Sequence, residues 1–96
     1  MIRNEFSWLA LTPDPIPVEE VRRWAIRPDC GAVVVFCGTT RDHSEGTSGV
    51  SELAYEAYEA QAEQRLVALE AEARDSWPQI RAVAALHRTG VVRLGE

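Results

Sequence analysis

The chain has 96 residues, of which 46% are hydrophobic and 26% are charged, and its formal net charge is −5. This length allows one domain with a modest core and is too short for two. The negative charge comes without a basic stripe, which argues against nucleic acid as the main partner. No apolar run approaches the ~20 residues of a membrane span and no segment resembles a signal peptide, so we expect a cytoplasmic protein with no membrane association.

The first part of the chain predicts a strand followed by a helix. Phe6 to Leu11 alternates weakly between apolar and polar side chains, as strands do, and a cluster of three prolines ends the run. An apolar stripe then extends from Val18 to Ile26, with glutamates near its start and arginines near its end. Each charge complements the dipole of a helix at that position. Pro28 ends the predicted helix.

The run from Gly31 to Thr40 is continuously apolar until its last residues and contains three consecutive valines. Such a run predicts a strand that is buried on both faces. It is followed at once by Arg41, Asp42 and His43. The sequence therefore predicts a buried strand that delivers a small polar cluster to the rim of a sheet, where binding sites are often built.

The second half predicts a strand, a long helix and two further strands. Val50 to Tyr58 is the first strand, and its core part alternates with period two. Glu59 to Trp77 has apolar residues at helical spacing, so we expect these to anchor the helix to the core: Ala62, Leu66, Leu69, Ala73 and Trp77. Ile80 to Leu86 reads as a further strand and Val91 to Leu94 as the opening of another.

The element order predicts an α+β fold with a two-layer β-α-β-β-α-β core, formed by residues 1–96 as a single domain. We expect Trp8 and Trp24, like Trp77, to lie in the packed interior. Cys30 and Cys37 are seven residues apart on an extended segment, too far to form a disulfide, and we expect them to be buried as small apolar side chains. No recognised metal-ligand spacing is present, and we expect neither metal nor cofactor.

Four sequence blocks, in a characteristic order, carry a resemblance to the large, catalytic subunit of molybdopterin synthase. The resemblance covers almost everything from Gly31 to Glu96. It implies an α/β-hammerhead-type fold, in which the predicted core carries additional strands. The blocks are GAVVVFCGTTRDHSEG, LAYEAYEAQAEQRL, EARDSWP and LHRTGVVRLGE.

The resemblance also implies a substrate-binding site at the end of the Gly31–Thr40 run. Arg41 offers a planar fork of donors suited to phosphate oxygens, and in the family this arginine belongs to the pocket for the anionic pterin precursor. The alternative from the residues alone is a surface arginine paired with Asp42 or a glutamate. Thr39 and Thr40 match neighbouring pocket positions, and His43 is either a proton-transfer group or a capping residue. We interpret His87 as mainly architectural. The catalytic residues remain unknown.

The family converts cyclic pyranopterin monophosphate into molybdopterin by installing two sulfurs as a dithiolene. Its large subunit forms a central homodimer, and a small ubiquitin-like subunit supplies sulfur as a C-terminal thiocarboxylate. The resemblance therefore implies sulfur transfer. The partners that it implies are the small ubiquitin-like subunit, a second copy of the chain and cyclic pyranopterin monophosphate.

All ten basic residues of this chain are arginine. The lysines that the family uses in catalysis therefore have no counterpart, and neither does the C-terminal part that carries them. We expect the 96-residue chain to be incomplete for catalysis. The alternative is a non-catalytic anion-binding or dimerisation module derived from the same family.

Overall fold

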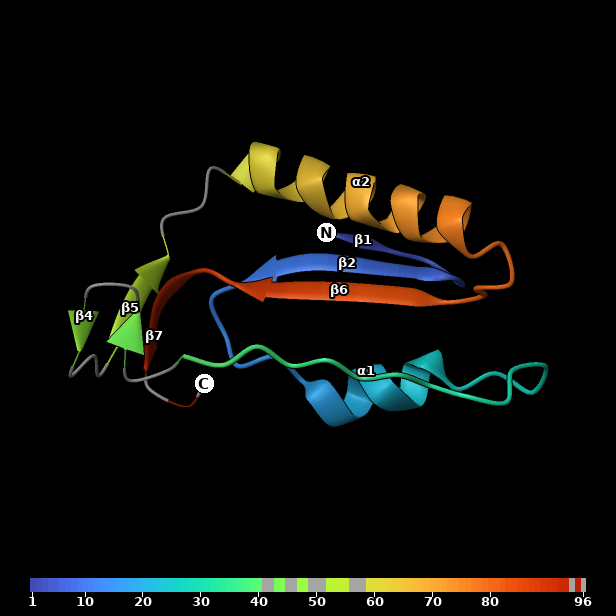
Figure 1. Cartoon of the computed structure of the whole chain (residues 1–96), viewed down its shortest axis with the longest axis horizontal. Coiled ribbons are helices and arrows are strands. Elements are labelled where there is room, and N and C mark those ends of the chain that lie inside the picture. Colours follow the sequence, from blue (N-terminus) through green and yellow to red (C-terminus); the bar gives the residue numbers. More distant parts are fainter. Residues whose placement is uncertain (41–42, 45–46, 49–51, 56–58, 94, 96) are drawn as a thin grey trace.

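The computed structural model describes residues 1–40, 43–44, 47–48, 52–55, 59–93 and 95. Within these residues, two helices and seven strands follow one another (Figure 1). Their bounds are β1 Ile2–Arg3, β2 Ser7–Thr12, α1 Val18–Ala25, β3 His43–Ser44, β4 Thr47–Ser48, β5 Glu52–Tyr55, α2 Glu59–Ser76, β6 Val83–Arg88 and β7 Gly90–Arg93.

A three-stranded sheet with the order β1-β2-β6 forms the centre of the fold. β1 and β2 are antiparallel neighbours, with Ile2 opposite Leu9. β2 and β6 are parallel and stay in register from Ser7 opposite Val83 to Thr12 opposite Arg88. Strands that pair in parallel need a long crossover. Here both helices and all the intervening residues lie between the two strands in the sequence.

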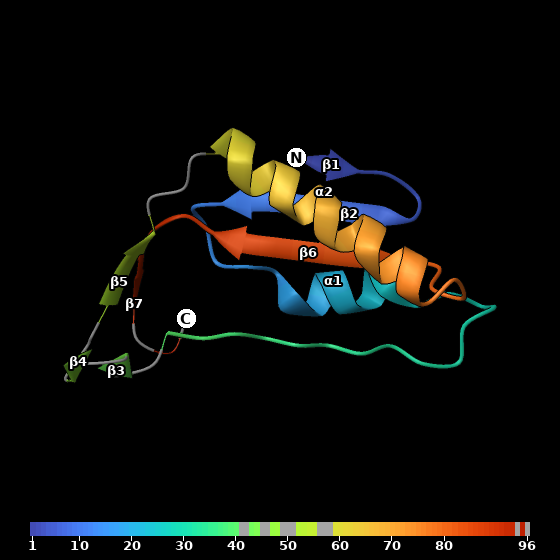
Figure 2. The same cartoon turned by 45° about the horizontal axis from the view of Figure 1, so that its top comes forward.

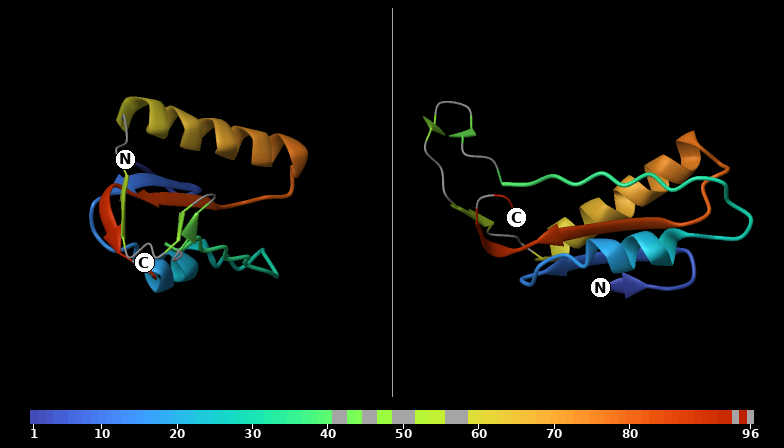
Figure 3. Two further views of the ribbon diagram at one scale, coloured as in Figure 1. Left: turned by 60° about the vertical axis from the view of Figure 1, so that its left-hand side comes forward. Right: turned by 90° about the horizontal axis from the view of Figure 1, so that it is seen from below.

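The two helices lie on opposite faces of this sheet. Figure 1 shows α2 above the strands and α1 below them, and the side view in Figure 3 shows the same order. Contacts of α2 with β2 and β6, and of α1 with β6, hold the layers together. The α+β class expected from the sequence is confirmed. The two-layer order is not, because the helices flank the sheet instead of sharing one face.

The middle strand β2 supplies the buried core. Trp8, Leu9 and Ala10 are the buried hydrophobic residues among those described. Trp8 also meets Trp24 of α1 edge to face, with 5.7 Å between the ring centroids, a geometry that aromatic pairs prefer. The guanidinium of Arg3 lies 3.6 Å from the centroid of the Trp8 ring. The interior positions expected for Trp8 and Trp24 agree with this packing.

The helix α1 carries its charges as the sequence analysis expected. Glu19 lies in the first turn and binds Arg22 and Arg23, three and four residues further along. The hydrogen bond from Arg22 holds the pKa of the Glu19 carboxyl below its usual value, and the same pair raises the pKa of Arg22. These side chains are exposed, so the pairs support the helix locally and add little to the stability of the fold.

The face that α2 turns toward the sheet differs from the predicted one. Leu69 and Trp77 are each 58% exposed, so the expectation that they anchor the helix is wrong. The half-buried positions are Ala62, Glu63, Leu66, Glu70, Ala73 and Arg74. The ion pair of Glu70 with Arg74 lies on the face toward the sheet. Its side chains bind the Ser7 hydroxyl and backbone carbonyls of the neighbouring segments.

Arg74 is the centre of that polar contact. Its guanidinium donates to the backbone carbonyls of Phe6, at 2.8 Å, and Arg81, at 3.1 Å. It also pairs with Glu70 at 3.2 Å, and Glu70 accepts a hydrogen bond from the hydroxyl of Ser7. One side chain of α2 thus binds the segments that enter β2 and β6, where the parallel ladder begins.

The run from Gly31 to Thr40 is the main correction to the sequence analysis. Its backbone is extended but belongs to no sheet, and residues 31–39 are all exposed. Val34 and Phe36 are each 92% exposed, so the prediction of a strand buried on both faces is wrong. An apolar run shows that a segment is suited to burial. It does not show what covers it, and in the described part of the chain the sheet ends at β6.

The other predicted elements are found with shifted limits. β2, α1, α2 and β6 correspond to the predicted strands and helices. β5 lies inside the predicted strand from Val50 to Tyr58, and positions 50, 51 and 56–58 are outside the described residues. β1 and the β3–β4 hairpin were not predicted, because two-residue strands carry no detectable period. Cys30 and Cys37 are free thiols, as expected, but the expectation that both are buried is wrong, because Cys30 is half-buried and Cys37 is exposed.

We predict that Arg74→Ala lowers the free energy of unfolding by about 2–3 kcal/mol, because hydrogen bonds to charged groups contribute ~1.5–3 kcal/mol. Urea denaturation followed by circular dichroism measures the change. Arg65→Ala is the matched control, since Arg65 lies on an exposed face of the same helix and should cost less than about 0.5 kcal/mol. Equal losses in the two variants would contradict the role assigned to Arg74.

Candidate functional site

The predicted site follows the extended run at one end of the molecule. Thr39 is exposed and Thr40 is buried. Arg41 and Asp42 lie outside the described residues, so their predicted roles stay predictions. His43 opens β3 and is the backbone partner of Ser48 in β4. Its side chain is likewise not described.

Thr40 has the most unusual environment of these residues. Its side chain is buried, with 4% of the residue exposed. The hydroxyl Oγ1 has no hydrogen-bond partner. A buried hydroxyl normally has one, because leaving it unpaired costs about 1–3 kcal/mol. Thr40 therefore presents one donor and two acceptor positions that none of the residues described in the structure uses.

The backbone of Thr40 is tied to the far end of the chain. Its carbonyl accepts a hydrogen bond of 2.9 Å from the amide of Gly95. Gly95 has a φ of 84°, a left-handed conformation that glycine adopts without strain. Sequence analysis missed this contact, since the two residues are far apart in the sequence and no local pattern connects them. The contact brings Thr40 close to the end of β7.

Two small sheets surround this end of the molecule. β3 pairs with β4, and β5 pairs with β7 from Glu52 opposite Arg93 to Tyr55 opposite Gly90. Figure 1 and Figure 2 place both pairs beyond the end of the central sheet, next to the point where the extended run finishes. The structure therefore brings Thr40, His43 and the end of β7 into one region.

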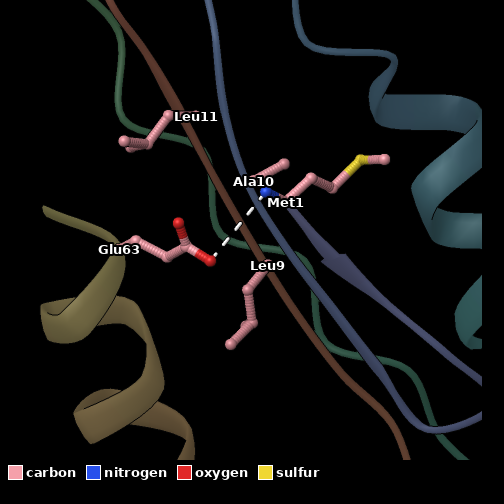
Figure 4. Close-up of a pocket in the computed structure, with 5 residues that line it drawn as sticks. All are labelled: Met1, Leu9, Ala10, Leu11 and Glu63. Atoms are coloured by element: carbon pink, nitrogen blue, oxygen red, sulfur yellow. Dashed lines mark ion pairs between the residues drawn. The ribbon is translucent and has the colours of Figure 1, made fainter. Parts of the chain in front are cut away.

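A cavity of about 100 Å³ lies elsewhere, between α2 and the central sheet. Figure 4 shows the five residues that line it: Met1, Leu9, Ala10, Leu11 and Glu63. The terminal ammonium of Met1 lies 3.9 Å from a carboxylate oxygen of Glu63. Ligand pockets for small molecules usually have ~300–1,000 Å³, so this cavity is too small, and it contains none of the predicted site residues.

His87 occupies a structural position, in agreement with its interpretation as architectural. It belongs to β6, where it lies opposite Leu11 of β2. Its Nδ1 atom is 2.6 Å from the carbonyl oxygen of Arg88. No group of histidine, cysteine, aspartate or glutamate side chains suited to a metal ion occurs within the described ranges. None of the helices in that part of the chain is long and apolar enough to cross a membrane.

The fold and the site together define an α+β domain that presents a short polar segment beyond the end of its sheet. The sequence profile of the MoaE protein family matches residues 11–96, which include all of this segment. The chain belongs to the MoaE family.

Named relatives agree with this assignment. Molybdopterin synthase catalytic subunits are 38% identical in Taeniopygia guttata over 90 residues and 39% identical in Bos taurus over 88 residues. The matches cover 94% and 92% of this chain, and 57% and 46% of the respective relatives. The subunit of Homo sapiens is 39% identical over 88% of this chain and 44% of its own length. The chain thus spans about half the length of these relatives.

We predict that Thr40→Val raises the free energy of unfolding by about 1–2 kcal/mol, because valine has nearly the same shape and removes an unpaired buried hydroxyl. Thermal or urea denaturation of the unliganded protein measures the change. Thr39→Val is the matched control, since Thr39 is exposed and its replacement should leave stability within about 0.5 kcal/mol. A loss of stability in Thr40→Val would show that the hydroxyl is hydrogen-bonded in the unliganded protein.

Proposed function

We propose that this protein acts as the large, catalytic subunit of molybdopterin synthase in molybdenum cofactor biosynthesis. The reaction transfers sulfur from a thiocarboxylated small subunit to cyclic pyranopterin monophosphate and forms the dithiolene of molybdopterin. The observation that carries this proposal is the family match over residues 11–96, together with relatives named as catalytic subunits of that enzyme. Residues 1–96 act as one domain in this proposal.

The proposed substrate-binding residues are Thr39, Thr40, Arg41 and His43. Thr40 supports this assignment most directly, because its buried hydroxyl lacks a partner and can donate to an oxygen of a bound phosphate. Arg41 is the next residue in the sequence, and its guanidinium supplies the charge and the two parallel donors that a phosphate binds. Thr39 and His43 extend the same polar segment on either side.

The proposed protein partners are the small ubiquitin-like sulfur-carrier subunit and a second copy of this chain. The proposed compartment is the cytoplasm, since Cys30 and Cys37 are both free thiols and free thiols are typical of a reducing compartment. The proposal includes neither a cofactor nor a metal ion.

The chemistry of the site sets a limit on the 96-residue chain by itself. Acyl and proton transfer in such a reaction require a nucleophile or a general acid–base of suitable pKa. Lysine is absent from this sequence, and arginine stays protonated. We therefore propose that these 96 residues bind the anionic pterin but transfer sulfur poorly. The absence of lysine equally favours the second candidate, a non-catalytic anion-binding or dimerisation module.

Arg41→Ala is expected to weaken binding of cyclic pyranopterin monophosphate by about 1.5–3 kcal/mol, the contribution of a hydrogen bond to a charged group. Isothermal titration calorimetry measures the affinity. Arg22→Ala is the control for the loss of one positive charge, because Arg22 pairs with Glu19 on α1 and should leave the affinity unchanged. Unchanged binding in Arg41→Ala would remove this residue from the site.

Thr40→Val, in contrast, should weaken the binding of cyclic pyranopterin monophosphate while it stabilises the unliganded protein. The two effects have opposite signs because the hydroxyl is unpaired before binding and hydrogen-bonded afterwards. Calorimetry and denaturation on the same samples measure both. If the substitution raises stability and leaves affinity unchanged, the Thr40 hydroxyl does not contact the pterin.

Formation of molybdopterin tests the proposed reaction. The 96-residue chain, supplied with thiocarboxylated small subunit and cyclic pyranopterin monophosphate, should bind the pterin and yield little product. Turnover at the rate of a longer relative, such as the subunit of Bos taurus, would show that no lysine is needed. Absence of pterin binding in calorimetry would exclude both the catalytic role and the anion-binding alternative.

A further inference from the structure

The end of the extended run from Gly31 to Thr40 is held by a backbone hydrogen bond to Gly95. The amide of Gly95 donates to the carbonyl oxygen of Thr40 over 2.9 Å. Within the described part of the chain, no backbone hydrogen bond joins residues 31–39 to another segment. Gly95 therefore supplies the backbone contact that fixes the chain at Thr40, after a long stretch of residues without one.

Thr40 differs in burial from the run that precedes it. Residues 31–39 are exposed, whereas Thr40 is only 4% exposed. The change occurs at the residue to which Gly95 donates. Because an exposed extended chain has many accessible conformations, the contacts at its end determine where Thr40 lies.

The same hydrogen bond acts on the chain that follows Thr40. The Thr40 carbonyl belongs to the peptide unit that links Thr40 to the next residue, and a peptide unit is planar. A hydrogen bond that holds the carbonyl oxygen therefore restricts the orientation of the whole unit. It thus limits the directions in which the proposed substrate-binding residues can follow Thr40.

The backbone conformation of Gly95 explains why this position holds a glycine. Its φ is 84°, in the left-handed region that residues with a Cβ adopt only at a cost. A Cβ at Gly95 would meet no described atom within 4 Å apart from its chain neighbours. Space does not select glycine here, so the backbone angle does. Gly95 donates to Thr40 from this conformation.

β7 connects Gly95 to the rest of the fold. β7 continues from β6 and forms an antiparallel ladder with β5. Figure 1 and Figure 2 show β7 leading from the end of β6 toward the end of the extended run. Gly90 at the start of β7 has a φ of 76°, and Gly90 and Gly95 are the described residues with positive φ. Thr40 is thus tied to the central sheet through β6, β7 and Gly95.

We propose that Gly95 is a positioning residue for Thr40 and for the proposed substrate-binding residues that follow it. It holds the Thr40 carbonyl from a left-handed conformation and so directs this part of the chain toward a phosphate-bearing ligand. Gly95 itself touches no ligand. The identity of the ligand rests on the proposed function, whereas the contact between Gly95 and Thr40 does not.

The experiment changes the handedness of one added methyl group at position 95. Gly95→Ala made with L-alanine disfavours a φ of 84°, whereas the same substitution made with D-alanine favours it. Both variants contain the same atoms and differ only in the backbone conformation that they favour. Chemical ligation at Cys37 gives both 96-residue chains, because the ligation needs a cysteine at the junction.

Calorimetry with cyclic pyranopterin monophosphate measures the effect on the site. L-alanine should raise the dissociation constant about tenfold, and D-alanine should leave it within about twofold of the unmodified value. Gly90→Ala is the matched control for strain, since Gly90 also has a positive φ and free surroundings but lies at the other end of β7. It should lower the melting temperature as Gly95→Ala does and leave the affinity unchanged.

A measurement without ligand separates this inference from the proposed function. NMR spectroscopy detects the scalar coupling across the hydrogen bond between the Gly95 nitrogen and the Thr40 carbonyl carbon. The coupling should be present in the unmodified chain and with D-alanine, and it should be lost with L-alanine. If the coupling follows this pattern and the unmodified chain does not bind the pterin, the proposed function fails and the positioning of Thr40 by Gly95 is supported.

The inference is overturned if the unmodified chain lacks the coupling, or if L-alanine leaves the affinity of a pterin-binding chain unchanged. It is also overturned if L-alanine and D-alanine weaken binding equally, because the added methyl group and not the backbone angle is then responsible. Equal weakening by Gly90→Ala and Gly95→Ala would assign the effect to general strain in β7. Circular dichroism confirms the fold of each variant.

Discussion

The parallel ladder between β2 and β6 is the constraint on which the rest of the structure depends. It joins residues 7–12 to residues 83–88, so the chain must complete both helices and its extended run before the ladder closes. The buried core lies on β2, and the ion pair of Glu70 with Arg74 binds the end where the ladder begins. That junction therefore ties α2 to the sheet at the end where both strands begin.

The sequence predicted the elements that carry a local period. β2, α1, α2 and β6 were expected within a few residues of their observed bounds, because alternation, helical spacing, prolines and terminal charges act over short distances. The face of α2 was predicted less well. Hydrophobicity selected Leu69, but Glu70 and Arg74 occupy half-buried positions. Their partners on neighbouring segments are the Ser7 hydroxyl for Glu70 and backbone carbonyls for Arg74, which only the tertiary structure brings close.

The candidate site shows the same division between local and long-range information. The sequence itself shows a polar segment after an apolar run, but the predicted delivery of that segment to a sheet rim by a buried strand is not found, because the run is exposed and belongs to no sheet. The burial of Thr40 and the environment of its hydroxyl could not be predicted, because they depend on tertiary packing. Its contact with Gly95 could not be predicted either, because that residue is more than fifty positions away. The proposed roles of Arg41 and His43 rest on the resemblance to the family.

Val34 and Phe36 are exposed because a segment that is suited to burial also needs a second structural element to cover it. An apolar, β-branched run records that a strand is suited to burial. The cover itself is a separate structural element, and the described part of this chain leaves the run without one. An extended apolar segment is stabilised when it pairs with another strand, through backbone hydrogen bonds and burial of its apolar side chains. Thr40 ends this segment, and its backbone contact with Gly95 is what joins the proposed phosphate-binding residues to the fold at that end.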